Sequence, residues 1–321
     1  MADDLQVVRR SSVPATKVAH YPCTANLITP PSASTLLRVA SLRTFLILGR
    51  VSNLPTLWSN CLAGWWLGGA GNSEMLPFLF AGVTLLYLGG MFLNDAFDVE
   101  FDRQHREERP IPSGRIPLAT VWRSGFALLA AGAGLLFWCG TLTGGLGVGL
   151  ALCIILYDAI HKVVTFSPVL MGICRCFVYL VAASTATLGV TGWAIWCGLA
   201  LGAYVVGLSF MARRESVRGP LPRWPVALLA APVALALLMN VGGFRQAATL
   251  LSLVLVLWIV RCLRRTFWTN APSVSRTISG LLAGIVFVDW LAMADAPHKM
   301  GFAFITLFAG ALVFQRFAPA T

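Results

Sequence analysis

The chain has 321 residues, of which 57% are hydrophobic and only 12% charged, and its formal net charge is +11. Soluble domains carry about a quarter charged residues, so the composition excludes an ordinary soluble domain. Apolar stretches of roughly 17–25 residues recur along the chain, and each can cross a hydrocarbon core of about 30 Å. We therefore expect an all-α, polytopic membrane helix bundle.

The first forty residues differ from the rest because they are polar and rich in Ser, Thr and Pro. They lack the apolar core of a signal peptide. We expect a disordered cytoplasmic tail over residues 1–40 and one transmembrane domain over residues 41–321. An organelle transit peptide is the alternative, and the acidic residues Asp3 and Asp4 count against it.

Ten apolar segments follow in chain order as candidate spans, and nine remain if one of them does not cross. The candidates are 44–68, 75–93, 118–139, 141–157, 169–189, 193–211, 225–241, 246–262, 277–294 and 300–316. The segment 277–294 is the weakest because it contains Asp289, which we interpret as a boundary residue near the outer face.

The basic residues are distributed unevenly between the connections. Those at 94–117, 158–168, 212–224 and 263–276 are rich in Arg and Lys, whereas the opposite connections offer only Arg245 and Lys299. Positive loops stay inside, so we expect the N-terminus and the basic loops on the cytoplasmic side, of a bacterial inner membrane. The excess of basic residues is explained by this topology and by an anionic ligand or an anionic membrane leaflet. Binding of a nucleic acid is not needed to explain it.

One segment, "GGMFLNDAFDVEFDRQHREERPIPSGRI" at 89–116, holds six of the thirteen acids of the chain. In a helix, at about 100° per residue, Asp95, Asp98 and Asp102 share one face within about 60°, and Glu100 lies on the far side. Carboxylates on one stripe repel each other unless a cation lies among them. Oxygen ligands of this kind suit Mg²⁺ with substrate phosphates.

Two arginines extend this pattern. Arg106 and Arg109 fall on the same stripe if the helix continues to Pro110, which would end it. A metal face followed by two guanidiniums indicates a site for a Mg²⁺-bound phosphate or diphosphate. The alternative is a solvated charged loop.

Asn94, Asp95, Asp98 and Asp102 match the motif N-D-x-x-D-x-x-x-D, and "RPIPSGRI" follows them. In both features the chain resembles the UbiA superfamily of intramembrane prenyltransferases, from about Arg43 to Phe317. The resemblance implies a nine-span bundle around an apolar cavity, with Mg²⁺ on the three aspartates. Arg106 and Arg109 lie a residue or two closer to Asp102 than in the family pattern.

Three further segments extend the resemblance, and each leaves alternatives open. Asn53 in "GRVSNLPTLWSN" would hold a diphosphate oxygen or make an interhelical hydrogen bond. Lys162 in "YDAIHK" would bind diphosphate or anchor the inner boundary. Arg175 in "MGICR" would contact the substrate phosphate, an internal carboxylate or a structural partner, since a charge inside a span is costly otherwise.

The second aspartate motif of the family, D-x-x-x-D, is missing. Its positions fall on Ala212 and Ser216, and Arg213 and Arg214 stand beside them. In one interpretation a single Mg²⁺ suffices and the arginines neutralise the far side of the diphosphate. In the other, prenyl transfer is lost or altered. The segments "ARRES", "YDAIHK" and "MGICR" most resemble the EboC-like branch of the superfamily.

The resemblance implies an integral-membrane prenyltransferase that transfers an isoprenoid from a Mg²⁺-bound prenyl diphosphate to an aromatic or lipid acceptor. Asp95, Asp98 and Asp102 would be catalytic, and Asp158 would orient or deprotonate the acceptor. The expected diphosphate ligands are Asn53, Asn94, Arg106, Arg109, Lys162, Arg175, Arg213 and Arg214. The alternative is a non-catalytic or cyclase-like homologue that binds or presents an isoprenoid or lipid phosphate.

Overall fold

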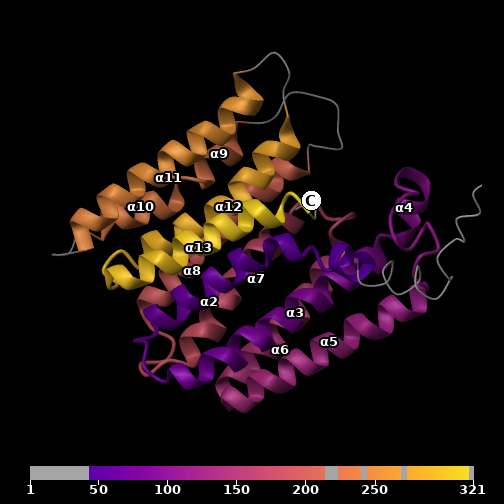
Figure 1. Ribbon diagram of the computed structural model, residues 1–321, viewed down its shortest axis with the longest axis horizontal. Helices are drawn as coiled ribbons and strands as arrows, with labels where there is room; N and C mark the ends of the chain where they lie inside the picture. Colours follow the sequence, from indigo (N-terminus) through magenta and orange to yellow (C-terminus); the bar gives the residue numbers. More distant parts are fainter. Residues whose placement is uncertain (1–42, 214–222, 240–243, 269–272, 318–321) are drawn as a thin grey trace, which may run out of the picture.

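The computed structural model describes residues 43–213, 223–239, 244–268 and 273–317, and the regular structure of these residues is entirely helical. The expected tail at 1–40 lies outside the described residues. The helices lie side by side in one bundle, with α5 and α6 at one flank and α10 and α11 at the other (Figure 1). This arrangement confirms the predicted all-α bundle.

The helices follow the candidate spans in chain order. They are η1 (Val51–Asn53), α2 (Leu54–Leu67), η2 (Ser73–Met75), α3 (Leu76–Phe97), α4 (Val99–His105), α5 (Leu118–Cys139), α6 (Thr141–Ile160), α7 (Ser167–Ser184), α8 (Gly192–Ala212), α9 (Trp224–Leu228), α10 (Ala231–Leu238), α11 (Phe244–Phe267), α12 (Val274–Ala292) and α13 (His298–Phe314).

Seven of the described helices are long and apolar enough to cross a membrane, against the ten candidates expected. They include α3, counted with η2 before it, and then α5, α6, α7, α8, α11 and α12. The other three candidates correspond to shorter helices. α2 has 14 residues and α13 has 17, and the segment 224–238 is divided into α9 and α10 before Pro232.

Glycines allow neighbouring helices to approach closely. A Cβ on Gly89 of α3 would lie 2.9 Å from the backbone oxygen of Gly125 in α5. A Cβ on Gly64 of α2 would lie 2.6 Å from the backbone oxygen of Tyr179 in α7. Such close approach is how helices associate in membranes, where burial of apolar surface gives little drive. The sequence therefore uses small residues where α3 meets α5 and α2 meets α7.

The middle of the bundle contains a buried acid, Asp289 of α12, which is 0% exposed. Its oxygens accept hydrogen bonds from Ser59 and Asn60 of α2 and from Tyr179 of α7, the last with an O–O distance of 2.6 Å. The interpretation of Asp289 as an outer-boundary residue was wrong, because three partners from other helices satisfy its carboxylate. The segment that carries it forms α12, one of the seven long apolar helices.

The acidic segment lies at one end of the bundle. α3 ends at Phe97, and after Asp98 the chain continues as the short helix α4, which projects from this end (Figure 1). The connection between α6 and α7, residues 161–166, comes to the same place through contacts with Asp98. The fold therefore brings four segments together there, from η1, α3–α4, the turn after α4 and the end of α6.

Candidate functional site

The acidic helix breaks twice, and this sets the positions of its charges. Asp98 joins α3 to α4, and Arg106 leaves the helix with φ −148°. The helix therefore does not continue to Pro110. A turn follows, with the Arg109 N–H donating to the Arg106 carbonyl at 3.1 Å. Arg109 thus returns to the acidic face through a turn rather than along a helical stripe.

The carboxylates divide between two faces as expected. Asp95 and Asp102 are 6% and 2% exposed. The Glu100 side chain is 73% exposed and pairs with Arg103 on the surface. Helical spacing separates Glu100 from Asp95 and Asp102, as expected, and Asp98 lies between these extremes as a half-buried residue.

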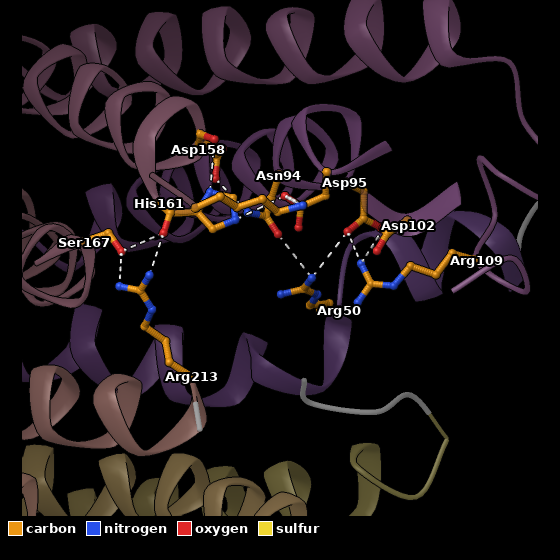
Figure 2. Close-up of polar contacts among 11 residues, drawn as sticks. Arg50, Asn94, Asp95, Asp102, Arg109, Asp158, His161, Ser167 and Arg213 are labelled. Atoms are coloured by element: carbon orange, nitrogen blue, oxygen red, sulfur yellow. Dashed lines mark hydrogen bonds and ion pairs between the residues drawn. The ribbon is translucent and has the colours of Figure 1, made fainter. Parts of the chain in front are cut away.

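Two guanidiniums neutralise this face. Arg109 Nη1 donates to Asp95 Oδ1 and to Asp102 Oδ2, each at 3.1 Å. Arg50 Nη2 donates to Asp95 Oδ1 at 3.3 Å and to Asn94 Oδ1 at 3.2 Å. Figure 2 shows both arginines reaching the acids from the same side. An anion that entered here would meet two fixed guanidiniums beside two carboxylates.

Asp98 is turned to a different set of partners. Its Oδ1 lies 2.8 Å from Lys162 Nζ and 3.1 Å from His161 Nε2. Burial opposes the charged carboxylate, but the bonds from His161 and Lys162 outweigh it and hold the pKa of Asp98 below its ordinary value. Burial also opposes protonation of His161, yet the contact with Asp98 raises the pKa of that imidazole. Both shifts favour an ion pair at the α3–α4 junction.

The donor atoms suit Mg²⁺, although the described residues do not gather into a ligand set. Within the described ranges, no group of three or more His, Cys, Asp and Glu side chains lies close enough to hold a metal ion. Asp95 and Asp102 share Arg109 instead, and Asp98 faces Lys162. Asp102 Oδ1, however, is buried without a hydrogen-bond partner among the described residues. An oxygen in this condition beside a second carboxylate fits a hard divalent cation.

An apolar cavity lies between α2, α3, α6 and α7. Its walls include Leu57, Val83, Leu150, Ile154 and Val178. Its polar lining residues are Tyr87, Tyr157, Asp158 and Arg175. The cavity is thus a mainly apolar space with a few polar groups, which is typical of a binding site for an amphipathic ligand.

Asp158 joins the cavity to the acidic face. It is 3% exposed, and its Oδ1 accepts a hydrogen bond of 3.0 Å from Asn94 Nδ2. Its Oδ2 has no hydrogen-bond partner among the described residues. Asn94 also accepts from Arg50, so one amide connects Asp158 to the guanidinium on Asp95.

The other predicted residues lie in separate surroundings. Arg175 donates to Asn60 and Thr56, and no described contact joins it to the acidic face. Arg213 donates to the backbone oxygens of His161, Val164 and Thr165 and so holds the loop after α6 (Figure 2).

Three predicted positions remain. Asn53 is buried at the end of η1. Arg106 is half-buried at the end of α4. Arg214 lies outside the described residues.

Sequence reasoning missed two site residues, Arg50 and His161. Arg50 has a positive φ of 40°, a conformation that is uncommon for residues other than glycine, and this turn directs its side chain to Asp95. A basic residue inside the first candidate span, 44–68, was the available signal. His161 was visible only as the neighbour of Lys162 in "YDAIHK".

Comparisons with known proteins agree on the family. The UbiA prenyltransferase family profile matches residues 52–281. A digeranylgeranylglyceryl phosphate synthase of Ignicoccus hospitalis is 39% identical over 103 residues, which are 32% of this chain and 34% of that protein. One of Methanosarcina mazei is 34% identical over 89 residues, 26% of this chain and 31% of the relative. These matches span about a third of the curated relatives' length.

Solved structures share the fold at low identity. The apo structure of a UbiA homologue from Aeropyrum pernix K1 aligns with a TM-score of 0.61 at 18% identity, over 78% of this chain and 98% of that one. A structure of a digeranylgeranylglyceryl phosphate synthase aligns with a TM-score of 0.55 at 19% identity, over 84% and 98%. Because the family profile covers most of the sequence and the helices follow the same fold, this chain belongs to the UbiA prenyltransferase family.

Proposed function

We propose that this protein transfers an isoprenoid group from a Mg²⁺-bound prenyl diphosphate to an acceptor held in the apolar cavity. One observation carries the proposal: two guanidiniums lie against buried carboxylates at one end of the bundle, and Asn94 links them to Asp158 in the wall of that cavity. A prenyl diphosphate has the matching form, with a highly charged head and an apolar tail.

Asp95, Asp98 and Asp102 are the proposed Mg²⁺ ligands, and Arg109 and Arg50 are the proposed contacts of the diphosphate. Bound Mg²⁺ would offset the negative charge that develops on the diphosphate as it leaves. The further diphosphate contacts proposed from the sequence are Asn53, Asn94, Arg106, Lys162, Arg213 and Arg214. Lys162 is the best supported of these, because its ammonium already lies beside Asp98.

Asp158 is the proposed base for the acceptor. Its Oδ2 is buried without a described hydrogen-bond partner, and the residue lines the cavity. Asn94 holds the other oxygen, which fixes the direction of the carboxylate. An acceptor hydroxyl at Oδ2 would lose its proton there as the new bond to the isoprenoid carbon forms and the bond from that carbon to diphosphate breaks.

The acceptor is proposed to be a lipid in preference to an aromatic compound. The curated relatives are named digeranylgeranylglyceryl phosphate synthases, which supports a lipid acceptor. Membership of the EboC-like branch stays a prediction that rests on "ARRES", "YDAIHK" and "MGICR".

The proposed location is a bacterial inner membrane with the acidic face toward the cytoplasm. The supporting observation is the excess of Arg and Lys in the connections on that side.

One observation favours a non-catalytic isoprenoid or lipid-phosphate carrier as the second candidate. The second aspartate motif is absent from the sequence, and the guanidinium of Arg213 is occupied by backbone oxygens of the loop after α6. Half of the family's metal site would then be lost while the cavity persists.

Purified protein in lipid nanodiscs distinguishes the two candidates. We expect geranylgeranyl diphosphate with Mg²⁺ to bind and to release diphosphate in the presence of an acceptor, and chelation by EDTA to stop the release. Asp98→Ala should abolish turnover without unfolding the protein, whereas Glu100→Ala, an exposed acid of the same segment, should behave as the wild type. Binding of the donor without turnover in the wild type would instead support the carrier.

A further inference from the structure

A positively charged side chain lies in the wall of the apolar cavity, apart from the acidic face. Arg175 of α7 lines the cavity together with Leu57, Val83 and Val178. A guanidinium inside a membrane-spanning bundle is costly and is retained where it is paired or used. An isoprenoid tail offers nothing that a guanidinium can bind, so the tail alone does not account for Arg175.

The described partners of Arg175 are neutral. Nη1 donates to Asn60 Oδ1 at 2.7 Å, and Nη2 donates to Thr56 Oγ1 at 3.4 Å. A guanidinium has five N–H donors, and each of these bonds uses one. Both partners belong to α2, so they hold the arginine from one side while it also borders the cavity.

The nearest acid in this network is already saturated by other groups. Ser59 and Asn60 donate to Asp289 from α2, and Tyr179 donates to it from α7. The Asn60 amide stands between Asp289 and Arg175, because its Nδ2 donates to the acid and its Oδ1 accepts from the arginine. The acid thus fixes the arginine through Asn60 without occupying the guanidinium directly.

We propose that Arg175 binds an anionic group of the acceptor, a carboxylate or a phosphate, inside the cavity. The planar guanidinium matches the paired oxygens of either group. Asp158 lines the same cavity, and Tyr87, Tyr157 and Cys174 are the other titratable residues in its lining. An acceptor would lie with its anionic end at Arg175 and its reacting hydroxyl at Asp158. This inference rests on the proposed function, because it names the chemistry of the acceptor.

Matched pairs of probes test the charge requirement in nanodiscs of neutral phosphatidylcholine, without any donor. One pair is 4-hydroxybenzoate and its methyl ester. The other is a long-chain glyceryl ether phosphate and the same glyceryl ether without phosphate. The wild type should bind at least one anionic probe about 10-fold or more tightly than its neutral match, as expected for a hydrogen-bonded charge. The pair that shows the preference distinguishes an aromatic acid from a lipid phosphate.

Variants then assign the preference to Arg175. Arg175→Gln should abolish it, and Arg175→Lys should keep part of it, because an ammonium retains the charge and loses the planar fork. Arg123→Gln, which removes an exposed arginine of α5, should leave the preference unchanged. Equal binding of both members of each pair by the wild type would overturn the proposal, as would an unchanged preference in Arg175→Gln.

The result can be separated from failure of the proposed function. If the wild type does not bind the prenyl diphosphate donor but prefers the anionic probe, the prenyltransferase proposal is contradicted. The proposal that Arg175 binds an anionic group is then still supported. If Arg175→Gln does not fold, the wild-type pairs and Arg175→Lys decide the matter. If Arg175→Lys kept the full preference for the anionic probe, the planar guanidinium would not be needed, and the proposed role of Arg175 would be overturned.

Discussion

Two buried acidic regions of this protein differ in how their oxygens are satisfied. At the mouth of the bundle, Asp95 and Asp102 share Arg109, and Asp102 Oδ1 has no partner among the described residues. In the middle of the bundle, Asp289 receives hydrogen bonds from three side chains. A saturated carboxylate stabilises the packing of its own helices, whereas an unsaturated one is prepared for a ligand. Substitutions should therefore affect activity at the first region and stability at the second.

Among the substitutions that separate these two regions, Asp102→Asn has the largest expected effect, and that effect is on turnover. Turnover should fall about 100- to 1,000-fold, because the site loses a charge that would hold Mg²⁺ against the diphosphate. The unfolding temperature should change little, since Arg109 keeps its bond to Asp95. Diphosphate release and thermal unfolding in nanodiscs measure the two quantities. If the Asp102→Asn variant lost stability and kept its turnover, the expected difference between the two acidic regions would be contradicted.

Asp289→Ala should have the opposite signature. It leaves Asn60, Ser59 and Tyr179 without their shared acceptor in the interior, and we expect a loss of about 3–5 kcal/mol in the free energy of unfolding. Denaturant unfolding in detergent gives this value. Binding of geranylgeranyl diphosphate should persist at temperatures where the variant remains folded. An unchanged stability would show that the network contributes little to packing.

Gly64→Ala tests the packing that holds this network together. The added Cβ would lie 2.6 Å from the backbone oxygen of Tyr179, so α2 and α7 must separate and Tyr179 must shift from Asp289. We expect a cost of about 1–3 kcal/mol. Gly134→Ala in α5 is the matched control, because a Cβ there meets nothing within 4 Å. Equal stability of the two variants would contradict this account.

The smallest effect concerns pH. The contact with Asp98 raises the pKa of His161, so the protonated imidazole stabilises the fold below its unfolded-state pKa of about 6.5. That contribution disappears as the pH rises through the raised pKa of the folded state. His161→Asn should therefore lower the unfolding temperature more at pH 6 than at pH 9, by an amount worth less than about 1 kcal/mol. The unfolding temperatures are measured with EDTA present, so that no divalent ion competes for Asp98. An equal difference between the wild type and His161→Asn at both pH values would exclude the ion pair.

Regular local structure made the acidic face predictable. Helical spacing alone separated Glu100 from Asp95 and Asp102, and the structure has Glu100 exposed and the other two buried. Long apolar segments likewise predicted the membrane-spanning helices α3, α5 and α6. Both inferences depend only on residues that are close in the sequence.

Features that depend on distant partners were not predictable. Asp98 pairs with Lys162, which follows α6 far along the chain, although spacing grouped Asp98 with Asp95 and Asp102. Asp289 resembled a boundary residue because its partners in α2 lie about 230 positions earlier in the chain. The angle between helices and the pairing of distant side chains follow from tertiary packing, which a single sequence does not display.

The bridge from Arg109 to Asp95 and Asp102 has a consequence for how the protein is handled. Zinc fingers unfold without their metal because nothing else offsets the charge and the lost ligation. Here Arg109 is the counter-ion of Asp95 and Asp102, so we expect the protein to fold without a divalent ion. Removing divalent ions with a chelator during purification should leave the protein folded in detergent, and adding Mg²⁺ back should restore the release of diphosphate.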